Sequence, residues 1–521
     1  MSNPHETFNE LETADYSRVR NAAIIGAGIA GLVTAKTLLT QGIACTLFER
    51  SACVGGVWAD GYLNFGVQLQ KELFEFPDWP LKEDTPQFTP GPIFKQYLDD
   101  YADHFAVRPH IRFNTSVDQV EPIGEQAFPR WRVKFREAGE DGSEDFDLVV
   151  VCTGLYSNIP HLPKLPARED YQGKVHHVSE IKSAAMLEGK RVGILGFGKS
   201  ATDIAIEAAE CASETHLVAR QLHWPIPRKL AGVLPFKWGV LSRLSSALYP
   251  LYKTPSRIER ALHMFGKPLV WSYWRLVETL LRFQFRLGSR FGTRVSLVPA
   301  EPMEIDTFGE ASMVLQPDLF RLVRQGRISL HQGEVINYTP TGIKLACGAE
   351  INVDIVVAAT GWRCDHSFFS ESLRSKLTIA DDGLYLYRQM LHPEVPGLVF
   401  IGYSSTVTNI LTYSLQARWL GELLAGKHQL PSNRAMADEI EALKSWKRSW
   451  MPPSTARGAR LIAHMQHYHD ELLRDFGANP MRKRGFLAAL KEVISPYQPS
   501  DYRAIAAGDW EKQEGRYERC A

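Results

Sequence analysis

The sequence lacks the features that would place it in several other classes of protein. Its 521 residues hold only seven cysteines, which are scattered, odd in number and never spaced as CxxC. This argues against a disulfide scaffold, a zinc ribbon and a dithiol redox centre. The formal net charge is zero, so the overall composition points to no nucleic-acid partner.

The sequence also lacks a targeting segment and a membrane-spanning run. The first twenty residues, MSNPHETFNELETADYSRVR, are polar and partly acidic, unlike a signal peptide. No uninterrupted apolar run approaches the roughly 18 residues of a spanning helix. We therefore expect a cytoplasmic protein, with any membrane contact confined to its surface. The length exceeds that of one ordinary core, so two or more domains are expected.

A glycine-rich turn stands near the start of the chain, in AAIIGAGIAGLVTAKTLL. Residues 22–25 are apolar enough for a buried parallel strand, and Gly26, Gly28 and Gly31 have the GxGxxG spacing that precedes a helix. Backbone N–H groups at such a helix start bind a pyrophosphate. The next apolar strand ends in Glu49, about twenty residues on, where an acid holds ribose hydroxyls. The turn predicts a dinucleotide site.

A second turn repeats this design in KRVGILGFGKSATDIAIEAAE. Gly196 and Gly198 make the turn, and Ala201 is the small third position. The next strand ends in Arg220, where the first unit has an acid. A guanidinium binds a 2′-phosphate that a carboxylate would repel. The second site is therefore predicted to prefer NADPH.

Two turns indicate two dinucleotides that exchange a hydride. The sequence ER…GGVW after the first turn, with Gly55 to Trp58, resembles FAD proteins. If FAD occupies the first site and NADPH the second, the possible classes of protein are flavoprotein reductases and monooxygenases. Disulfide reductases need a dithiol pair near the flavin, and this sequence has none.

Between the turns, YQGKVHHVSEIK resembles the FxGxxxHxxx(Y/F)K fingerprint of flavin-containing monooxygenases of the dimethylaniline-monooxygenase type. Gly173, His177 and Lys182 match, whereas Tyr171 replaces Phe and Ile181 replaces the final aromatic residue. The Baeyer–Villiger variant has Trp at that last position. KELFEFPDWPLKEDTPQF, VARQLHWPIPR, VVAATGW, LQARWLGELLAGKHQLPS, HDELLRDFGANP and SPYQPSDYR also resemble the family, so the likeness spans nearly the whole chain.

The resemblance implies a reaction and a set of site residues. NADPH reduces FAD, the reduced flavin forms a C4a-hydroperoxide with O₂, and a soft nucleophilic nitrogen or sulfur of a small molecule takes one oxygen. Gln68 lies where animal members have Asn beside the flavin, and it is the predicted catalytic residue. The predicted cofactor-binding residues are Gly26, Ala27, Gly28, Ile29, Ala30, Gly31, Glu49, Val57, Trp58, Gln68 and Leu69 for FAD and its nicotinamide contact, and Gly196, Gly198, Ser200, Ala201, Thr202, Asp203, Arg220, Thr360 and Gly361 for NADP and the return crossing.

Residues 228–294, called the basic insertion below, have an unusual composition. They hold thirteen Lys and Arg against Glu259 and Glu278, a net charge of +11. Around WSYWRLVETLLRFQFRLGSR, basic residues fall on one helical face and Leu276, Leu280, Phe283 and Leu287 on another. Three interpretations stay open: a lid over the flavin, a surface that lies on an anionic membrane, or a face paired with acidic residues or a second subunit.

We predict an α/β fold with two Rossmann-like domains, one for FAD and one for NADPH, the second inserted in the first, plus a helical insertion. The expected divisions are 1–165 and 356–450 for the FAD domain, 166–355 for the NADPH domain and 451–521 for a C-terminal helical extension. A Baeyer–Villiger monooxygenase acting on a ketone is one alternative, and an uncoupled flavin-binding NADPH oxidase is another. We expect no metal, because HMQHYHDE lies in a stretch that matches the family's C-terminal helix.

Overall fold

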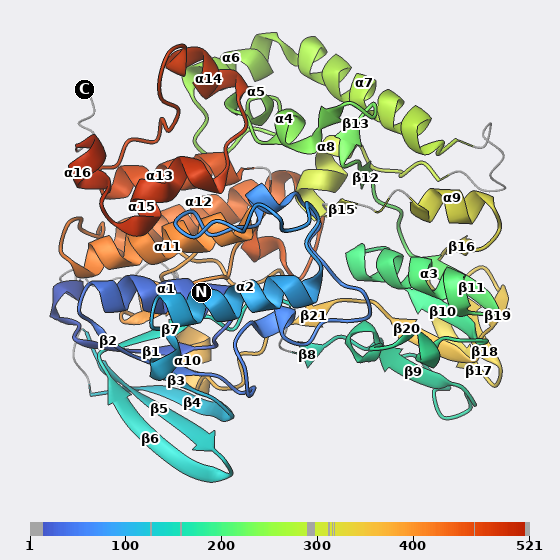
Figure 1. The fold of residues 1–521 in the computed structure, drawn as a ribbon, viewed down its shortest axis with the longest axis horizontal. Coiled ribbons are helices and arrows are strands. Elements are labelled where there is room, and N and C mark those ends of the chain that lie inside the picture. The colour runs from blue at the N-terminus through green and yellow to red at the C-terminus, as the bar shows by residue number, and fades with distance from the viewer. Residues whose placement is uncertain are drawn as a thin grey trace, which may run out of the picture.

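Two parallel sheets lie side by side under a layer of helices in the computed structural model (Figure 1). The structure describes residues 14–124, 128–156, 159–288, 297–310, 313–314, 316, 318–462 and 464–515. Both sheets have five strands. This architecture confirms the predicted α/β class with two dinucleotide-type units.

The first sheet has the order β22-β7-β1-β2-β3, with every neighbouring pair parallel. Its strands are β1 (Asn21–Ile25), β2 (Ala44–Phe48), β3 (Ile111–Arg112), β7 (Leu148–Val151) and β22 (Leu398–Phe400). All residues of β7 and β22 are buried, as expected for strands covered on both faces. Because β22 comes from far along the chain, this sheet is built from two separate parts of the sequence.

The second sheet has the order β16-β11-β10-β20-β9 and is likewise parallel. Its strands are β9 (Lys174–His177), β10 (Arg191–Leu195), β11 (Glu214–Ala219), β16 (Ser329–Gln332) and β20 (Ile355–Ala358). The expected boundary between residues 355 and 356 falls inside β20, so the chain leaves this sheet after Ala358.

Smaller strand groups complete the two units. Two are three-stranded sheets, one of β4 (Thr115–Ile123), β5 (Arg130–Glu137) and β6 (Glu140–Phe146), the other of β17 (Val335–Thr339), β18 (Gly342–Leu345) and β19 (Glu350–Asn352). The others are strand pairs: β8 (Ile159–Pro160) with β21 (Trp362–Arg363), β12 (Pro225–Ile226) with β15 (Met313–Val314), β13 (Lys229–Leu230) with β14 (Leu234–Pro235), and β23 (Ser405–Thr406) with β24 (Arg460–Ile462). The β8–β21 pair is antiparallel and joins the outgoing and returning crossings between the two sheets.

Helices from distant parts of the chain cover these sheets (Figure 1). They are α1 (Ile29–Thr40), α2 (Gly91–His104), α3 (Lys199–Cys211), α9 (Asp318–Arg324), α10 (Glu371–Lys376), α11 (Asn409–Leu424), α12 (Asn433–Trp450), α13 (Met465–Asp475), α15 (Arg503–Ala507) and α16 (Trp510–Glu514). Helix α11 is buried along almost its whole length and packs against α1 on one side and α13 on the other. It therefore forms the middle layer between the first sheet and the C-terminal helices.

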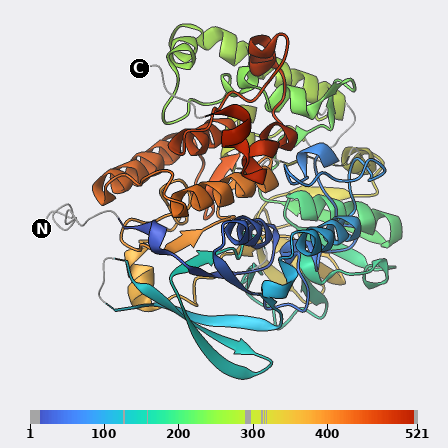
Figure 2. The same ribbon diagram turned by 60° about the vertical axis from the view of Figure 1, so that its left-hand side comes forward.

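The basic insertion forms a helical layer at the top of Figure 1, and the turned view in Figure 2 keeps it beside α14 (Ala488–Ile494). It contains α4 (Phe236–Val240), α5 (Arg243–Ser246), α6 (Arg257–Phe265) and α7 (Lys267–Phe285), and α8 (Met303–Ile305) follows it. Residues 289–294, with Arg290 and Arg294, lie outside the described residues.

The apolar residues of α7 divide between two faces. Trp274, Val277 and Leu281 are buried, whereas Leu276, Leu280 and Phe283 are exposed. Three of the four residues predicted to form the apolar face therefore point outward, whereas the fourth, Leu287, lies just after the end of α7 and is fully buried. In the part of the chain that the structure describes, no helix combines the length and apolarity needed to cross a membrane.

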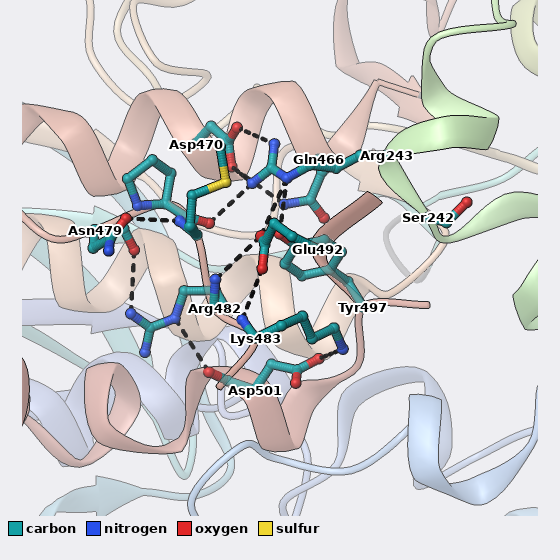
Figure 3. Close-up of polar contacts among 12 residues, drawn as sticks. Ser242, Arg243, Gln466, Asp470, Asn479, Arg482, Lys483, Glu492, Tyr497 and Asp501 are labelled. Carbon is teal, nitrogen blue, oxygen red and sulfur yellow. Dashed lines mark hydrogen bonds and ion pairs between the residues drawn. The ribbon is translucent and has the colours of Figure 1, made fainter. Parts of the chain in front are cut away.

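A buried ionic network fastens the insertion to the C-terminal segment (Figure 3). The Arg243 guanidinium donates to both carboxylate oxygens of Asp470, at 2.7 and 3.0 Å, and to the Tyr497 hydroxyl at 2.8 Å. Its Nε also lies 3.3 Å from Glu492 Oε1. A planar guanidinium suits this bidentate geometry, so α5 is held against α13 and the segment that follows it.

Candidate functional site

The two glycine turns have the same backbone geometry at the ends of equivalent strands. Gly26 follows β1 with φ of 103°, and Gly196 follows β10 with φ of 124°, angles that favour glycine. The Gly26 N–H donates to the Phe48 carbonyl at 2.8 Å, and the Gly196 N–H donates to the Val218 carbonyl at 2.9 Å. Each turn is therefore tied to the end of the adjacent strand.

The first turn has the shape that a pyrophosphate needs. A Cβ on Gly31 would lie 1.9 Å from the Gly26 carbonyl oxygen, so only glycine permits this helix–strand contact. A Cβ on Gly28 would lie 3.7 Å from its nearest neighbour, the Cα of Gly56. Gly28 is the N-cap of α1 and supplies no side-chain cap. The helix start, with Ala27, Ile29 and Ala30 around it, thus keeps backbone donors for an anion.

Glu49 is buried beside this turn. Its Oε2 accepts the Ala27 N–H at 2.8 Å and its Oε1 accepts the Ser51 N–H at 2.9 Å. A carboxylate with one N–H on each oxygen still has lone pairs for two hydroxyl donors. Its position fits the predicted contact with a ribose.

The GGVW stretch lies against the same turn. The Gly55 N–H donates to the Ala27 carbonyl at 3.0 Å, and the residues from Gly56 to Trp58 form a short 3₁₀ helix. Trp58 packs on Phe94 with ring centroids 4.4 Å apart, whereas Val57 is exposed. The structure thus brings Gly55 and Gly56 next to the first turn, and the predicted FAD contacts of Val57 and Trp58 stay predictions.

The second turn leaves more open space. A Cβ on Gly198, the N-cap of α3, would meet no atom of the described residues within 4 Å. Ala201 and Thr202 are buried, and Ser200 is partly exposed at the helix start. This open helix start fits a second dinucleotide phosphate.

Asp203 has a role in the contact between the two units. Its Oδ2 accepts the Tyr62 hydroxyl at 2.8 Å and pairs with Lys199, and its Oδ1 accepts the Gln316 amide at 3.1 Å. Because Tyr62 belongs to the first unit, this buried carboxylate links α3 to it. Its predicted contact with NADP stays a prediction.

Arg220 stands exposed at the end of β11, the position that Glu49 has after β2. Burial and the nearby Arg363 and Arg220 guanidiniums lower the pKa of His161. The sequence did not single out His161 or Arg363. These two residues lie near Arg220 because strands β8 and β21 pair beside the crossing, with Ile159 opposite Arg363. This cationic corner fits a 2′-phosphate.

Thr360 and Gly361 lie in the return crossing. The Thr360 hydroxyl donates to the His161 carbonyl, and the His161 N–H donates to the Gly361 carbonyl at 3.0 Å. His177, fully buried, has Nε2 3.1 Å from that same Gly361 carbonyl. These bonds fix the crossing between the two sheets.

A cavity of about 410 Å³ opens between the two units and the helical layer. Gln68 and Leu69 line it from the first unit, Gly198 from the second, and α7 closes it with Trp274 and Leu281. Its walls also include His223, Tyr156, Tyr273, Thr307, Phe308, Asn409 and Arg460, which sequence reasoning did not connect with the site. The other predicted site residues, among those described, do not line it.

No cluster of three or more His, Cys, Asp or Glu side chains suited to a metal occurs within the described ranges. In the histidine-rich stretch, His467 Nε2 lies 2.7 Å from Glu259 Oε1 on α6, and His464 Nε2 lies 2.6 Å from the Pro250 carbonyl. These histidines therefore contact the basic insertion.

Comparisons with known proteins agree with this geometry. The chain is 30% identical to "Probable flavin-containing monooxygenase 1" of Arabidopsis thaliana, over 94% of this chain and 97% of that protein. The solved S-allyl-L-cysteine S-oxygenase of Allium sativum has a TM-score of 0.61 at 20% identity, covering 95% of this chain and 94% of that one. A cyclohexanone monooxygenase from Rhodococcus sp. Phi1 bound to NADP⁺ has a TM-score of 0.64 at 17% identity, covering 96% and 98%.

The sequence model of flavin-binding monooxygenase-like proteins matches residues 19–263 and 301–516. The unmatched stretch between them contains α7. Most of both sheets, both turns and the C-terminal helices fall within the match. The chain therefore belongs to the flavin-binding monooxygenase-like family and is a monooxygenase enzyme that uses FAD and NADPH.

Proposed function

We propose that this enzyme transfers one oxygen atom of O₂ to a soft nucleophilic nitrogen or sulfur of a small molecule, at the expense of NADPH. One observation carries the proposal. The cavity brings Gln68 and Leu69 of the first unit and Gly198 of the second to one space, whose remaining walls are largely apolar. Such a space suits a small organic substrate and limits the access of water to the reaction.

In this proposal the first turn and Glu49 hold FAD, and the second turn and Arg220 hold NADPH. The flavin supplies the electron transfer and the oxygen chemistry when bound. The side chains orient the reactants: Gln68 presents an amide at the cavity wall, where it can hydrogen-bond to a reacting group. Glu49 and the start of α1 would hold the ribose and the pyrophosphate of FAD, and neither lines the cavity.

We further propose that the basic insertion is a lid. Leu230 and Leu234 line the cavity from the β13–β14 hairpin, and Tyr273 and Val277 line it from α7. The Arg243 network holds this lid to α13. Since the family match omits residues 264–300, the part of the lid that contains α7 is where substrate preference can differ from that of relatives.

The outer face of the same layer supports a second role, as a surface that lies on an anionic membrane. Its exposed apolar side chains include Ile258, Phe265, Trp271 and Phe486, and Phe486 is 88% exposed. Exposed cations stand among them, namely Arg257, Arg260, Lys267, Arg282, Arg286, Arg484 and Lys491. The acids in these stretches, Glu259, Glu278 and Glu492, are bonded inside the layer. Apolar groups ringed by cations fit a bilayer interface with anionic lipids.

The Baeyer–Villiger alternative concerns the same fold. Ile181 is fully buried, and its carbonyl accepts the Leu63 N–H at 2.7 Å. Ile181 occupies the fingerprint position where the Baeyer–Villiger variant has Trp, which favours oxygenation of nitrogen or sulfur over insertion beside a ketone.

Product analysis under ¹⁸O₂ tests the proposal. The enzyme is supplied with NADPH and, in separate reactions, with a tertiary amine, a thioether or a cyclic ketone. The masses of the products are measured by mass spectrometry. We expect ¹⁸O in the N-oxide or sulfoxide, in step with NADPH consumed. Label in a lactone alone would establish the Baeyer–Villiger alternative, and NADPH consumption with no labelled product would establish an uncoupled oxidase.

A further inference from the structure

A histidine–aspartate pair at the cavity is not used by the function described above. His223 lies between β11 and β12 and lines the cavity. Its Nδ1 is 2.6 Å from Oδ1 of Asp306, whose side chain is fully buried. Asp306 opens a one-turn π-helix, Asp306–Glu310, a form of helix that is frequent at functional sites. The pair is thus built into the wall of the cavity.

The hydrogen bonds of Asp306 determine which nitrogen of the His223 imidazole carries the proton. Its second oxygen, Oδ2, accepts the Trp224 N–H at 2.7 Å. An ionised carboxylate only accepts hydrogen bonds, so the Nδ1 of His223 is the nitrogen that carries the proton. Nε2 is then the basic nitrogen of the ring. The carboxylate on Nδ1–H orients the ring and lies beside the positive charge that forms when Nε2 takes a proton.

The position of the ring leaves Nε2 available to a ligand. The His223 side chain is 14% exposed, and the cavity is the space that it lines. The other ionisable groups of the cavity wall are Lys199, Tyr156, Tyr273 and Arg460. Lys199 pairs with Asp203, the Tyr156 hydroxyl lies 3.0 Å from the Ser405 hydroxyl, and Arg460 donates to the Gly309 carbonyl at 3.0 Å. Burial raises the pKa of Tyr273, so this phenol stays protonated and is no base at neutral pH.

We propose that His223, oriented by Asp306, accepts the proton of an ammonium substrate and so makes protonated amines the preferred substrates of this enzyme. The inference rests on the proposed nitrogen oxygenation. An amine that is protonated at neutral pH has no free lone pair with which to attack oxygen. Transfer of its N–H proton to His223 Nε2 restores that lone pair inside the cavity.

The proton count of the reaction is consistent with this role. Oxygenation of a tertiary ammonium, R₃NH⁺ + O₂ + NADPH → R₃NO + NADP⁺ + H₂O, balances in atoms and charge. The second oxygen atom leaves as water, which takes up the hydride of NADPH and one proton. The proton that His223 receives from the substrate is the one that this water requires. A thioether has no such proton, so its oxygenation draws one from solvent instead.

Paired probes and a matched variant test the proposal. His223→Gln removes the base, and His110→Gln makes the same change at an exposed position of the first unit, away from the cavity wall. The probes are N,N-dimethylbenzylamine, protonated at neutral pH, and methyl phenyl sulfide, which carries no titratable group. We expect His223→Gln to lower kcat/KM for the amine by roughly 10- to 100-fold at neutral pH, within the usual range for a general base, and for the sulfide by less than about threefold. His110→Gln should alter neither value.

Two further readouts separate a base from a structural role. In the oxidised enzyme without NADPH, the amine should bind His223→Gln more weakly than wild type, while sulfide binding is unchanged. At a pH above that of half-protonation of the amine, the free base is present in solution and the variant should approach wild-type kcat/KM. Equal losses for both probes, or no recovery at high pH, would overturn the proposal. Wild type that oxygenates the sulfide but not the amine would also overturn it, whereas wild type that oxygenates neither probe would contradict the monooxygenase proposal itself.

Discussion

Single residues distinguish the two nucleotide turns, which otherwise share one backbone geometry. The acid at the end of β2 and the arginine at the end of β11 occupy equivalent places, and they carry opposite charge. Glu49 is buried against its turn, whereas Arg220 is exposed near His161 and Arg363. We therefore propose that Arg220 and the cations around it determine the choice between phosphorylated and unphosphorylated nicotinamide cofactors.

Arg220→Gln should weaken the use of NADPH without affecting that of NADH. A hydrogen bond to a charged group contributes about 1.5–3 kcal/mol, so KM for NADPH should rise roughly 10- to 100-fold. Steady-state NADPH oxidation measures this. Arg374→Gln, an exposed arginine of α10 in the first unit, is the control and should match wild type. An unchanged preference for NADPH in Arg220→Gln would show that the phosphate binds elsewhere.

The sequence reveals only some of these residues. Gly26, Gly196 and Arg220 were predictable because a turn and the strand after it form a local pattern with fixed spacing. The pairing of His223 with Asp306 was not, because it joins residues 83 positions apart. His223 lies in the family-like stretch VARQLHWPIPR, but nothing in that stretch indicates its partner. Arg363 likewise joins Arg220 only through the pairing of β21 with β8.

At the scale of elements, ion pairs between α5 and α13 hold the basic insertion against the C-terminal segment. The Arg243 network unites α5, α13 and α14, and Glu492 also accepts the backbone N–H groups of Arg482 and Lys483 (Figure 3). Burial of Asp470 and Glu492 is tolerated because each carboxylate has several donors. The helical nature of the insertion was predictable from periodicity. Its inward face was not, because α7 has apolar residues on two sides.

Arg243→Met should destabilise the insertion, because it leaves Asp470 and Glu492 buried without their main partner. Breaking a buried pair by removing one member costs about 3–5 kcal/mol. We expect a lower Tm in thermal unfolding and faster limited proteolysis within the basic insertion. Mass spectrometry of the fragments locates the cleavage sites. Arg260→Met, at an exposed position of α6, serves as the control. Unaltered proteolysis in Arg243→Met would mean that other contacts hold the layer.

Buried histidines should make the stability of the protein depend on pH. Burial lowers the pKa of His464 and of His469 to about 3, and that of His392 to about 4. The unfolded chain takes up these protons near the ordinary value of about 6.5, whereas the folded chain does not. Stability is therefore full above about pH 6.5 and falls as the pH is lowered, by up to about 1.4 kcal/mol per pH unit for each histidine.

Denaturant unfolding between pH 7.5 and pH 5 measures this slope. His469→Gln should flatten it by the share of one histidine, because His469 is buried with Nε2 bonded to Thr412. His110→Gln, at an exposed site, should leave the slope unchanged. A slope that is the same in His469→Gln and wild type would contradict the assignment.

At the scale of the whole molecule, one cavity lies where both nucleotide units and the helical layer meet. The split of the first sheet follows from this arrangement: the second unit is inserted between β7 and β22, and the paired crossings β8 and β21 tie the units together. The α/β class, the inserted second unit and the helical layer could be predicted from repeats and motifs. The position of the helical layer over the cavity could not, because it depends on long-range packing.

The outer surface of the helical layer predicts binding to anionic vesicles. Wild type should sediment with vesicles that contain phosphatidylserine, less so at high salt because the charge attraction is screened. Replacing Phe265, Trp271 and Phe486 together with Ser should abolish sedimentation, whereas Ile93→Ser with Ile336→Ser, at exposed apolar sites outside this layer, should not. Equal sedimentation of both variants would contradict a membrane role for this surface.

We expect the two nucleotide sites to deliver electrons from NADPH to a flavin at the shared cavity. The most direct test is anaerobic reduction of the bound FAD, which is measured as the loss of its visible absorbance. NADPH should bleach the wild-type flavin much faster than NADH does. Gly198→Ala should slow the NADPH reaction while keeping FAD bound, because its Cβ meets no described atom of the protein within 4 Å and would occupy the cofactor's space. Protein that stays colourless after reconstitution with FAD would contradict the first nucleotide site, and protein that reacts equally with NADH and NADPH would contradict the second.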